Sequence, residues 1–231
     1  MLQPTPPADI QKTTTQLHTE LHEWRETLCH GLKYQSIGIT DTDARSNLEL
    51  EMYYCSVKMI LFRPFCCDIQ IEGESRESAD FNQIGAQRCV NAAIYMLDLM
   101  PDNPIAEKVL QVLPWWTILH YICQATAILL LELCLSMLHM QDDPFKLWLA
   151  LRKGLRYLWA LSPGSKSAYR AWRIFRLLVG KAVQMYSHDV FKDVPTDAPT
   201  PPGWDDIDEE NLIGITTQSL EEIIAQTAQP T

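Results

Sequence analysis

One long apolar stretch limits what this chain can fold into. Between Ile118 and Leu138 the only formally charged residue is Glu132, and this length matches the roughly 20 residues that a membrane-spanning helix requires. The stretch is therefore either a bilayer span or the central helix of a globular core. The membrane alternative describes a small all-α membrane-associated protein with one span near Ile118–Leu138.

The composition favours the globular alternative. Of the 231 residues, 47% are hydrophobic and 21% are charged, which suits one substantial core that buries roughly 70% of the unfolded surface. Residues 1–15 are polar and proline-rich and lack the apolar segment of a secretory signal. The seven cysteines are scattered along the chain, so we expect a reducing compartment rather than a disulfide framework.

Apolar residues recur with helical spacing along most of the chain, and strand-type alternation is almost absent. We therefore expect an all-α, multi-helix fold. Its predicted divisions are a disordered segment over residues 1–15, a helical domain over 16–190, and a proline-containing linker with a disordered acidic tail over 191–231. The expected helices cover residues 10–28, 47–63, 79–100, 114–140, 144–161 and 165–186.

Prolines set several of these expected ends. Pro64 ends the second helix because it disfavours helical geometry at Arg63 and has no backbone N–H to donate. Pro114 suits the first turn of the fourth helix. The run Ser162-Pro163-Gly164 predicts a turn between the last two helices.

The net charge of −10 is unevenly distributed. Residues 144–187 carry nine bases and no acid, whereas residues 193–231 carry nine acids and no Lys or Arg. The basic segment predicts a candidate interaction face, for which three explanations stay open: a solvated helix face, a dock for an acidic segment, or a site for phosphate or another anion. The residues of this face are Arg152, Arg156, Lys166, Arg170, Arg173 and Arg176.

Apolar residues are mixed with acids in the C-terminal tail. Trp204, Ile207, Leu212 and Ile213 stand among Asp and Glu, a texture typical of disordered activation segments. The tail is thus a candidate activation segment, and the alternative is an inert solubilising extension.

Signatures of catalysis and of metal binding are weak. The chain has no phosphate-binding glycine loop and no Gly-x-Ser-x-Gly elbow. His18 and His22 are spaced as a zinc pair on a helix, but Thr19 replaces the Glu that the metalloprotease pattern requires. We therefore expect no catalytic, cofactor-binding or metal-binding residues.

Three stretches, in this order, resemble one known family. They are LELEMYYCSVKMILFRPF (48–65), PWWTILHYICQATAILLLEL (114–133) and LRKGLRYLWALSPGSKSAYRAWRIFRLL (151–178). Together they are similar to the C-terminal half of the fungal-specific transcription factor domain. This is the regulatory middle homology region of zinc binuclear cluster transcription factors, particularly the nitrate-assimilation and xylanolytic activator types. The resemblance covers about residues 17–186.

The resemblance implies a regulatory or interaction module of a transcription factor that acts in the nucleus. Its expected partners are transcriptional proteins, either a coactivator or a repressor, or the chain itself, with no membrane. The six-cysteine zinc cluster through which the family binds DNA does not occur in this sequence. DNA is therefore expected as a partner only if such a cluster exists outside this chain, which is either a fragment or a truncated relative.

Seven residues within the shared motifs are expected to have structural roles. Arg63 would interact with the negative end of its helix dipole, and Glu132 would pair with a base across a helix interface, because an unpaired buried carboxylate is costly. Trp115 and Trp116 would anchor the start of their helix on its neighbours. The full set is Arg63, Pro64, Phe65, Trp115, Trp116, Glu132 and Trp172.

Overall fold

The computed structural model of the protein describes residues 7–28, 42–67, 74–105, 113–140, 143–184, 191 and 194–197. All regular structure among these residues is helical, and no strand occurs in them, which confirms the predicted all-α fold. The α-helices are α1 (Pro7–Thr27), α2 (Thr42–Phe62), α3 (Arg76–Asp98), α5 (Trp115–Cys134), α6 (Pro144–Leu161) and α7 (Lys166–Gln184). Two short 3-10 helices are η2 (Arg63–Cys66) and η3 (Ser162–Gly164).

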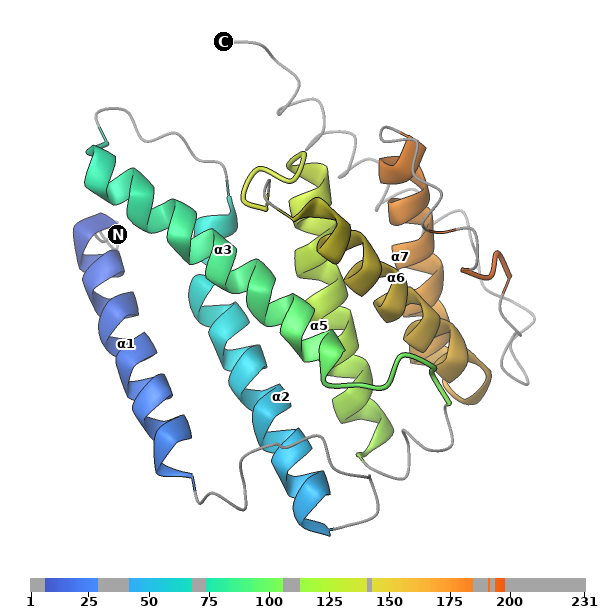
Figure 1. Ribbon diagram of the computed structural model, residues 1–231. Coiled ribbons are helices and arrows are strands. Elements are labelled where there is room, and N and C mark those ends of the chain that lie inside the picture. Colours follow the sequence, from blue (N-terminus) through green and yellow to red (C-terminus); the bar gives the residue numbers. More distant parts are fainter. Residues whose placement is uncertain are drawn as a thin grey trace, which may run out of the picture.

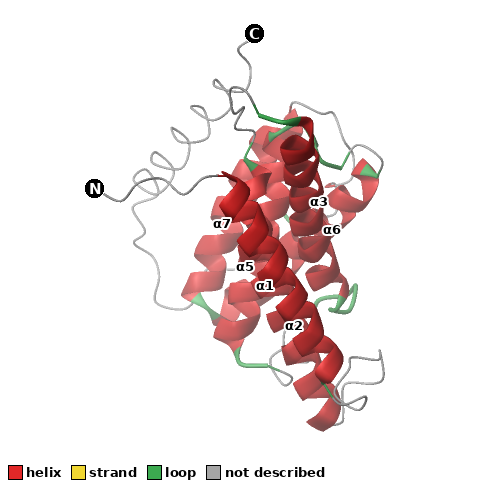
Figure 2. Cartoon of the chain, turned by 90° about the vertical axis from the view of Figure 1, so that its left-hand side faces the viewer, coloured by secondary structure: helices red, strands yellow, loops and turns green. Residues whose placement is uncertain are grey.

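The helices form two layers. In Figure 1, α1, α2, α5 and α7 stand side by side from left to right, and α3 and α6 cross in front of them. The view turned by 90° in Figure 2 shows α3 and α6 on one side of the other helices. Between the layers, α3 packs on α2 and α5, and α6 packs on α5 and α7. This arrangement surrounds α5 with α2, α3, α6 and α7.

Helix α1 begins earlier than expected. Residues 7–15 are helical, so this part of the segment predicted as disordered belongs to α1. The Gln11 side-chain amide donates hydrogen bonds to the Ser78 hydroxyl at 2.8 Å and to Asn82 Oδ1 at 2.9 Å, and Thr14 is buried. These contacts with the start of α3 give the first turns of α1 the tertiary partners that a short polar helix needs.

Local signals explain the ends of α6. Asp143 caps its start by accepting the Lys146 backbone N–H at 3.2 Å, and Pro144 occupies the first helical position. The 3-10 turn at Ser162–Gly164 ends it. The predicted bounds, 144–161, are confirmed.

Helix α5 ends earlier than the apolar pattern predicted. It stops at Cys134, and residues 135–139 form turns in which Ser136 and Met137 both have a φ of 58°. Non-glycine residues rarely adopt this left-handed geometry, so surrounding contacts must hold it. The expectation of one helix over 114–140 is therefore wrong in its last turns, and a helical span as far as Leu138 is excluded with it.

The Glu132 side chain stabilises the turns that follow α5. Its Oε1 accepts the His139 backbone N–H at 2.7 Å, and its Oε2 lies 2.7 Å from His139 Nδ1. The two side chains are 1% and 5% exposed. The expected partner, a base on another helix, was wrong. Glu132 instead pairs with a histidine seven residues later, and this pairing turns the chain away from the helix axis.

A glycine allows α5 and α6 to approach closely. A Cβ added to Gly154 would lie 2.5 Å from Thr126 Oγ1 and 3.6 Å from a Leu97 methyl carbon. Thr126 is fully buried. Gly154 thus marks the point where the backbone of α6 meets side chains of α5 and α3.

Candidate functional site

The basic residues of the predicted face lie on α6 and α7. Arg152 and Arg156 belong to α6, and Lys166, Arg170, Arg173 and Arg176 belong to α7. Lys166 and Arg170 are exposed, whereas the other four are half-buried. The structure therefore brings these cations to two packed helices but does not present them uniformly to solvent.

Part of the α6 charge is used within the protein. Arg156 donates to the Asp102 carbonyl at 3.4 Å and to Asn103 Oδ1 at 3.3 Å, and Lys153 Nζ lies 3.0 Å from Asp102 Oδ1. The Lys153 ammonium holds the pKa of the Asp102 carboxyl below its ordinary value. These bonds tie the segment after α3 to α6, so Arg156 has a structural role that the sequence did not indicate.

Two arginines of α7 lie over aromatic rings of the same helix. The Arg173 guanidinium lies 5.7 Å from the centroid of Tyr169, and that of Arg176 lies 6.0 Å from Trp172. Trp172 is 4% exposed, which agrees with its expected structural role. A guanidinium over an aromatic face is attracted by the ring quadrupole, so the rings of α7 favour these positions for Arg173 and Arg176.

The chain returns to this surface after α7. Arg176 Nε donates to the Pro195 carbonyl at 3.2 Å, and Trp159 Nε1 donates to the Asp197 carbonyl at 2.8 Å. Phe191 packs edge-on against Trp148 with 5.5 Å between ring centroids. The start of the acidic region thus lies against α6 and α7. The candidate activation residues Trp204, Ile207, Leu212 and Ile213 lie outside the described residues.

The Arg-Pro-Phe motif forms the joint between α2 and α3. Arg63 and Pro64 are exposed at the start of η2, and α2 ends at Phe62, one residue before the predicted end. Phe65 is buried, packs edge-on against Phe81 at 5.5 Å, and lies so close to Gly85 that an added Cβ would meet its ring at 2.9 Å. The motif therefore supports the fold through Phe65.

The paired tryptophans do not anchor α5 on its neighbours. Trp115 is 45% exposed and Trp116 is 59% exposed. Their rings meet edge to face, with 5.9 Å between centroids and an angle of 86°. Rings that leave about half of their surface in solvent do not anchor the helix, so the predicted role was wrong.

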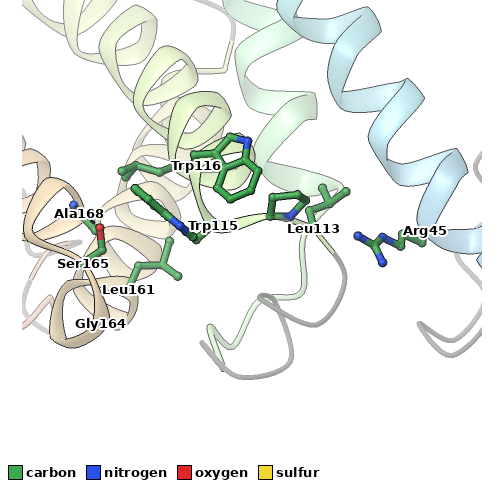
Figure 3. Close-up of a pocket in the computed structure, with 10 residues that line it drawn as sticks. Arg45, Leu113, Trp115, Trp116, Leu161, Gly164, Ser165 and Ala168 are labelled. Atoms are coloured by element: carbon green, nitrogen blue, oxygen red, sulfur yellow. Dashed lines mark hydrogen bonds between the residues drawn. The ribbon is translucent and has the colours of Figure 1, made fainter.

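These tryptophans instead line a cavity at the end of the bundle (Figure 3). The cavity has a volume of about 480 Å³ and lies where α5 begins and where the α6–α7 turn closes. In Figure 3, Arg45 lies at one end beside Leu113, and Trp115 lies toward the α6–α7 turn. The lining residues are Arg45, Leu113, Pro114, Trp115, Trp116, Leu119, Leu161, Gly164, Ser165 and Ala168.

Sequence reasoning did not find this cavity. Its lining comes from three separated parts of the chain, around Arg45, around Trp115 and around Ser165. The sequence of each part predicts only a helix start or a turn, and in none of them are the residues spaced as in a known binding motif. The two adjacent tryptophans were the only feature that could have indicated the cavity. Their apolar side chains suggested burial in the core and not the wall of a binding cavity.

Of the two histidines of α1, His18 packs against an aromatic side chain of α2. His18 meets the Phe62 ring edge to face at 5.1 Å, and burial, with Arg88 and Lys58 nearby, lowers its pKa. Within the described ranges, no group of three or more His, Cys, Asp or Glu residues is arranged to hold a metal ion.

Helix α5 is long and apolar enough to cross a membrane. Its mean hydropathy is 1.6 over a window of which 61% is buried inside the bundle. A mostly buried core helix of a globular protein has the same properties, and the packing of α5 between α3, α6 and α7 matches that description.

Comparison with known proteins gives one similarity. No protein-family model matches the chain, and no solved structure matches it. Among curated proteins it is similar to the transcription regulator galc of Aspergillus niger, with 28% identity over 185 residues. The match covers 68% of this chain and 22% of that protein, so the chain spans about a fifth of its relative's length. The helical bundle described above is therefore similar in sequence to part of a fungal transcription regulator.

Proposed function

We propose that this chain takes part in the regulation of transcription, as a non-catalytic helical interaction module that acts in the nucleus. The similarity to a fungal transcription regulator carries the proposal. The three motifs that resemble the fungal-specific transcription factor domain agree with this similarity, and they lie on α2, α5, α6 and α7.

The proposed interaction surface is the basic face of α6 and α7 together with the acidic tail. Arg170 and Lys166 are exposed on α7, and the described start of the tail contacts the same helices through Pro195 and Asp197. A coactivator or a repressor that binds acidic-hydrophobic segments would compete with this surface for the tail. The chain itself is the other expected partner.

A tethering experiment tests this function. The chain is fused to an unrelated DNA-binding domain, and transcription from a reporter with the matching sites is measured in fungal cells. We expect the fusion to change reporter output several-fold, and replacing Trp204, Ile207, Leu212 and Ile213 by Ala to weaken that change. The unfused chain is the control. A fusion that enters the nucleus and leaves the reporter unchanged would contradict the proposed role.

We predict that the chain alone does not bind duplex DNA with sequence specificity. Phosphate neutralisation by Lys and Arg supplies much of the affinity for DNA, and this chain has a net charge of −10 with part of its basic charge already bonded to Asp102 and Asn103. The measurement is fluorescence anisotropy with random and genomic duplexes at physiological salt. Tight binding that depends on sequence would show the prediction to be wrong.

We also predict that the acidic tail beyond Asp197 docks weakly on the basic face. Each exposed charge pair contributes only ~0.2–1 kcal/mol and is screened by salt, so the contact should be reversible. Changing Arg170 and Arg173 to Glu should shift the NMR signals of the Trp204 indole, as should high salt. The matched control changes Lys12 of α1 and Arg76 of α3 to Glu. It alters the net charge equally but leaves the basic face of α6 and α7 intact.

For this docking, one result is decisive. Identical Trp204 signals in the unmodified chain, the α7 variant and high salt would mean that the tail is not docked. The basic face would then serve an outside partner or solvent alone.

A further inference from the structure

The cavity at the end of the bundle is suited in size and lining to a small molecule. Its volume of about 480 Å³ falls within the ~300–1,000 Å³ range of ligand pockets. Leu113, Leu119, Leu161 and Ala168 supply apolar walls. Such a space excludes a helix but accepts a ligand with a compact apolar body.

The exposed tryptophans indicate an aromatic or similarly flat body. Trp115 and Trp116 leave 45% and 59% of their surface in solvent, although burial of apolar surface is favourable by roughly 25 cal/mol per Å². Their edge-to-face arrangement creates a corner between two ring planes. A planar ring placed in that corner would stack on one indole and meet the edge of the other.

Arg45 gives the cavity its charge preference. It is the only formally charged residue among those that line the cavity, and no ion pair of the described part of the chain involves it. It also lies in the first turn of α2, where the helix dipole disfavours a cation. A carboxylate in the cavity would relieve this unfavourable placement.

We propose that this cavity binds a small arylalkanoate, which is an aromatic ring joined by a short apolar chain to a carboxylate. The ring would occupy the corner between Trp115 and Trp116, and the carboxylate would meet Arg45 beside Leu113, at the other end in Figure 3. This inference stands on the cavity alone and goes beyond the proposed function, to which it would add a small-molecule effector.

The charge preference is tested with two probes of the same shape. In calorimetric titrations of the full chain, 4-phenylbutyrate is expected to bind about tenfold more tightly than the neutral 4-phenylbutanamide, as for a charge-assisted hydrogen bond. Arg45→Gln should remove this difference. The matched control, Lys146→Gln, changes an exposed cation at the other end of α6 and should preserve it.

The position is tested by changing the walls. Trp116→Ala should weaken 4-phenylbutyrate binding about tenfold, whereas Phe145→Ala, which removes another ring of 59% exposure outside the cavity, should not. Gly164→Leu should block the cavity, because space is open at its Cβ position. Gly180→Leu, also at an open position on α7, is its control. Thermal unfolding of each variant verifies that the fold is retained.

Three results would overturn the proposal. The first is equal binding of the acid and the amide, and the second is binding that survives both Trp116→Ala and Gly164→Leu. The third concerns another occupant, the chain's own tail. If replacing Trp204 and Ile207 by Ala shifts the indole signals of Trp115 and Trp116 without any ligand, the tail fills the cavity. Loss of reporter activity in the tethering experiment would leave these binding results unaffected, so the two proposals fail separately.

Discussion

Replacing Glu132 by Ala is expected to lower the free energy of unfolding by about 2–5 kcal/mol, because two buried polar groups would lose their partner at about 1–3 kcal/mol each. The change would leave the His139 backbone N–H without its acceptor and His139 Nδ1 without its partner, each now at 2.7 Å. It would also release the left-handed residues Ser136 and Met137, whose geometry these bonds maintain. Urea unfolding followed by circular dichroism gives the free energy.

Asp80→Ala is the matched control for this prediction. It removes the carboxylate that faces Arg76, in an ion pair whose side chains are 69% and 96% exposed. Exposed pairs contribute ~0–1 kcal/mol, so this variant should unfold nearly like the unmodified chain. If the two variants lost the same small amount of stability, the Glu132–His139 contact would not be what ends α5.

The second large effect is expected where α5 meets α6. Gly154→Ala should destabilise the protein by about 1–3 kcal/mol, the usual cost of overpacking a dense core, although Ala favours helices over Gly by ~1 kcal/mol. The reason is the 2.5 Å separation between the new Cβ and Thr126 Oγ1. At Gly180, where an added Cβ would meet no atom of another part of the chain within 4 Å, the same substitution should stabilise the protein.

A double-mutant cycle isolates this contact. Thr126→Ala alone should cost about 1 kcal/mol or less, because the loss of a buried methyl group is partly offset by removal of a buried hydroxyl that has no hydrogen-bond partner among the described residues. Combined with Gly154→Ala it should restore stability, since the remaining contact between the two Cβ positions, 3.6 Å, is ordinary. Additive losses in the double variant would argue against a direct clash.

The sequence predicts this fold well where local signals coincide with apolar periodicity. Helix α6 has both, a cap at Asp143 and a turn after Leu161, and its predicted bounds were confirmed. Helix α5 was predicted too long because Leu135, Met137 and Leu138 continue its apolar pattern. The bond that ends it, between Glu132 and His139, depends on side-chain geometry that periodicity does not encode.

The functional surfaces were less predictable for the same reason. Residue type suggested a structural role for all three tryptophans. Trp172 is buried, but Trp115 and Trp116 are not, because burial depends on how the neighbouring helices are arranged. The cavity joins residues as far apart as Arg45 and Ser165, so no local pattern marks it. The sequence also suggests an interaction role for Arg156, whereas its guanidinium bonds to Asp102 and Asn103.

The packing order of the helices has a consequence for synthesis of the chain. Each helix from α2 to α7 packs on the one before it, so contacts are mostly local, an arrangement associated with fast folding. Helix α5 is the exception in timing, because α3 covers one of its sides and the later α6 and α7 cover another. The ribosome adds α6 and α7 at about 5–20 residues per second. During this time α5, the most apolar helix, exposes the side that these two helices later cover. That interval is when chaperones would be expected to bind.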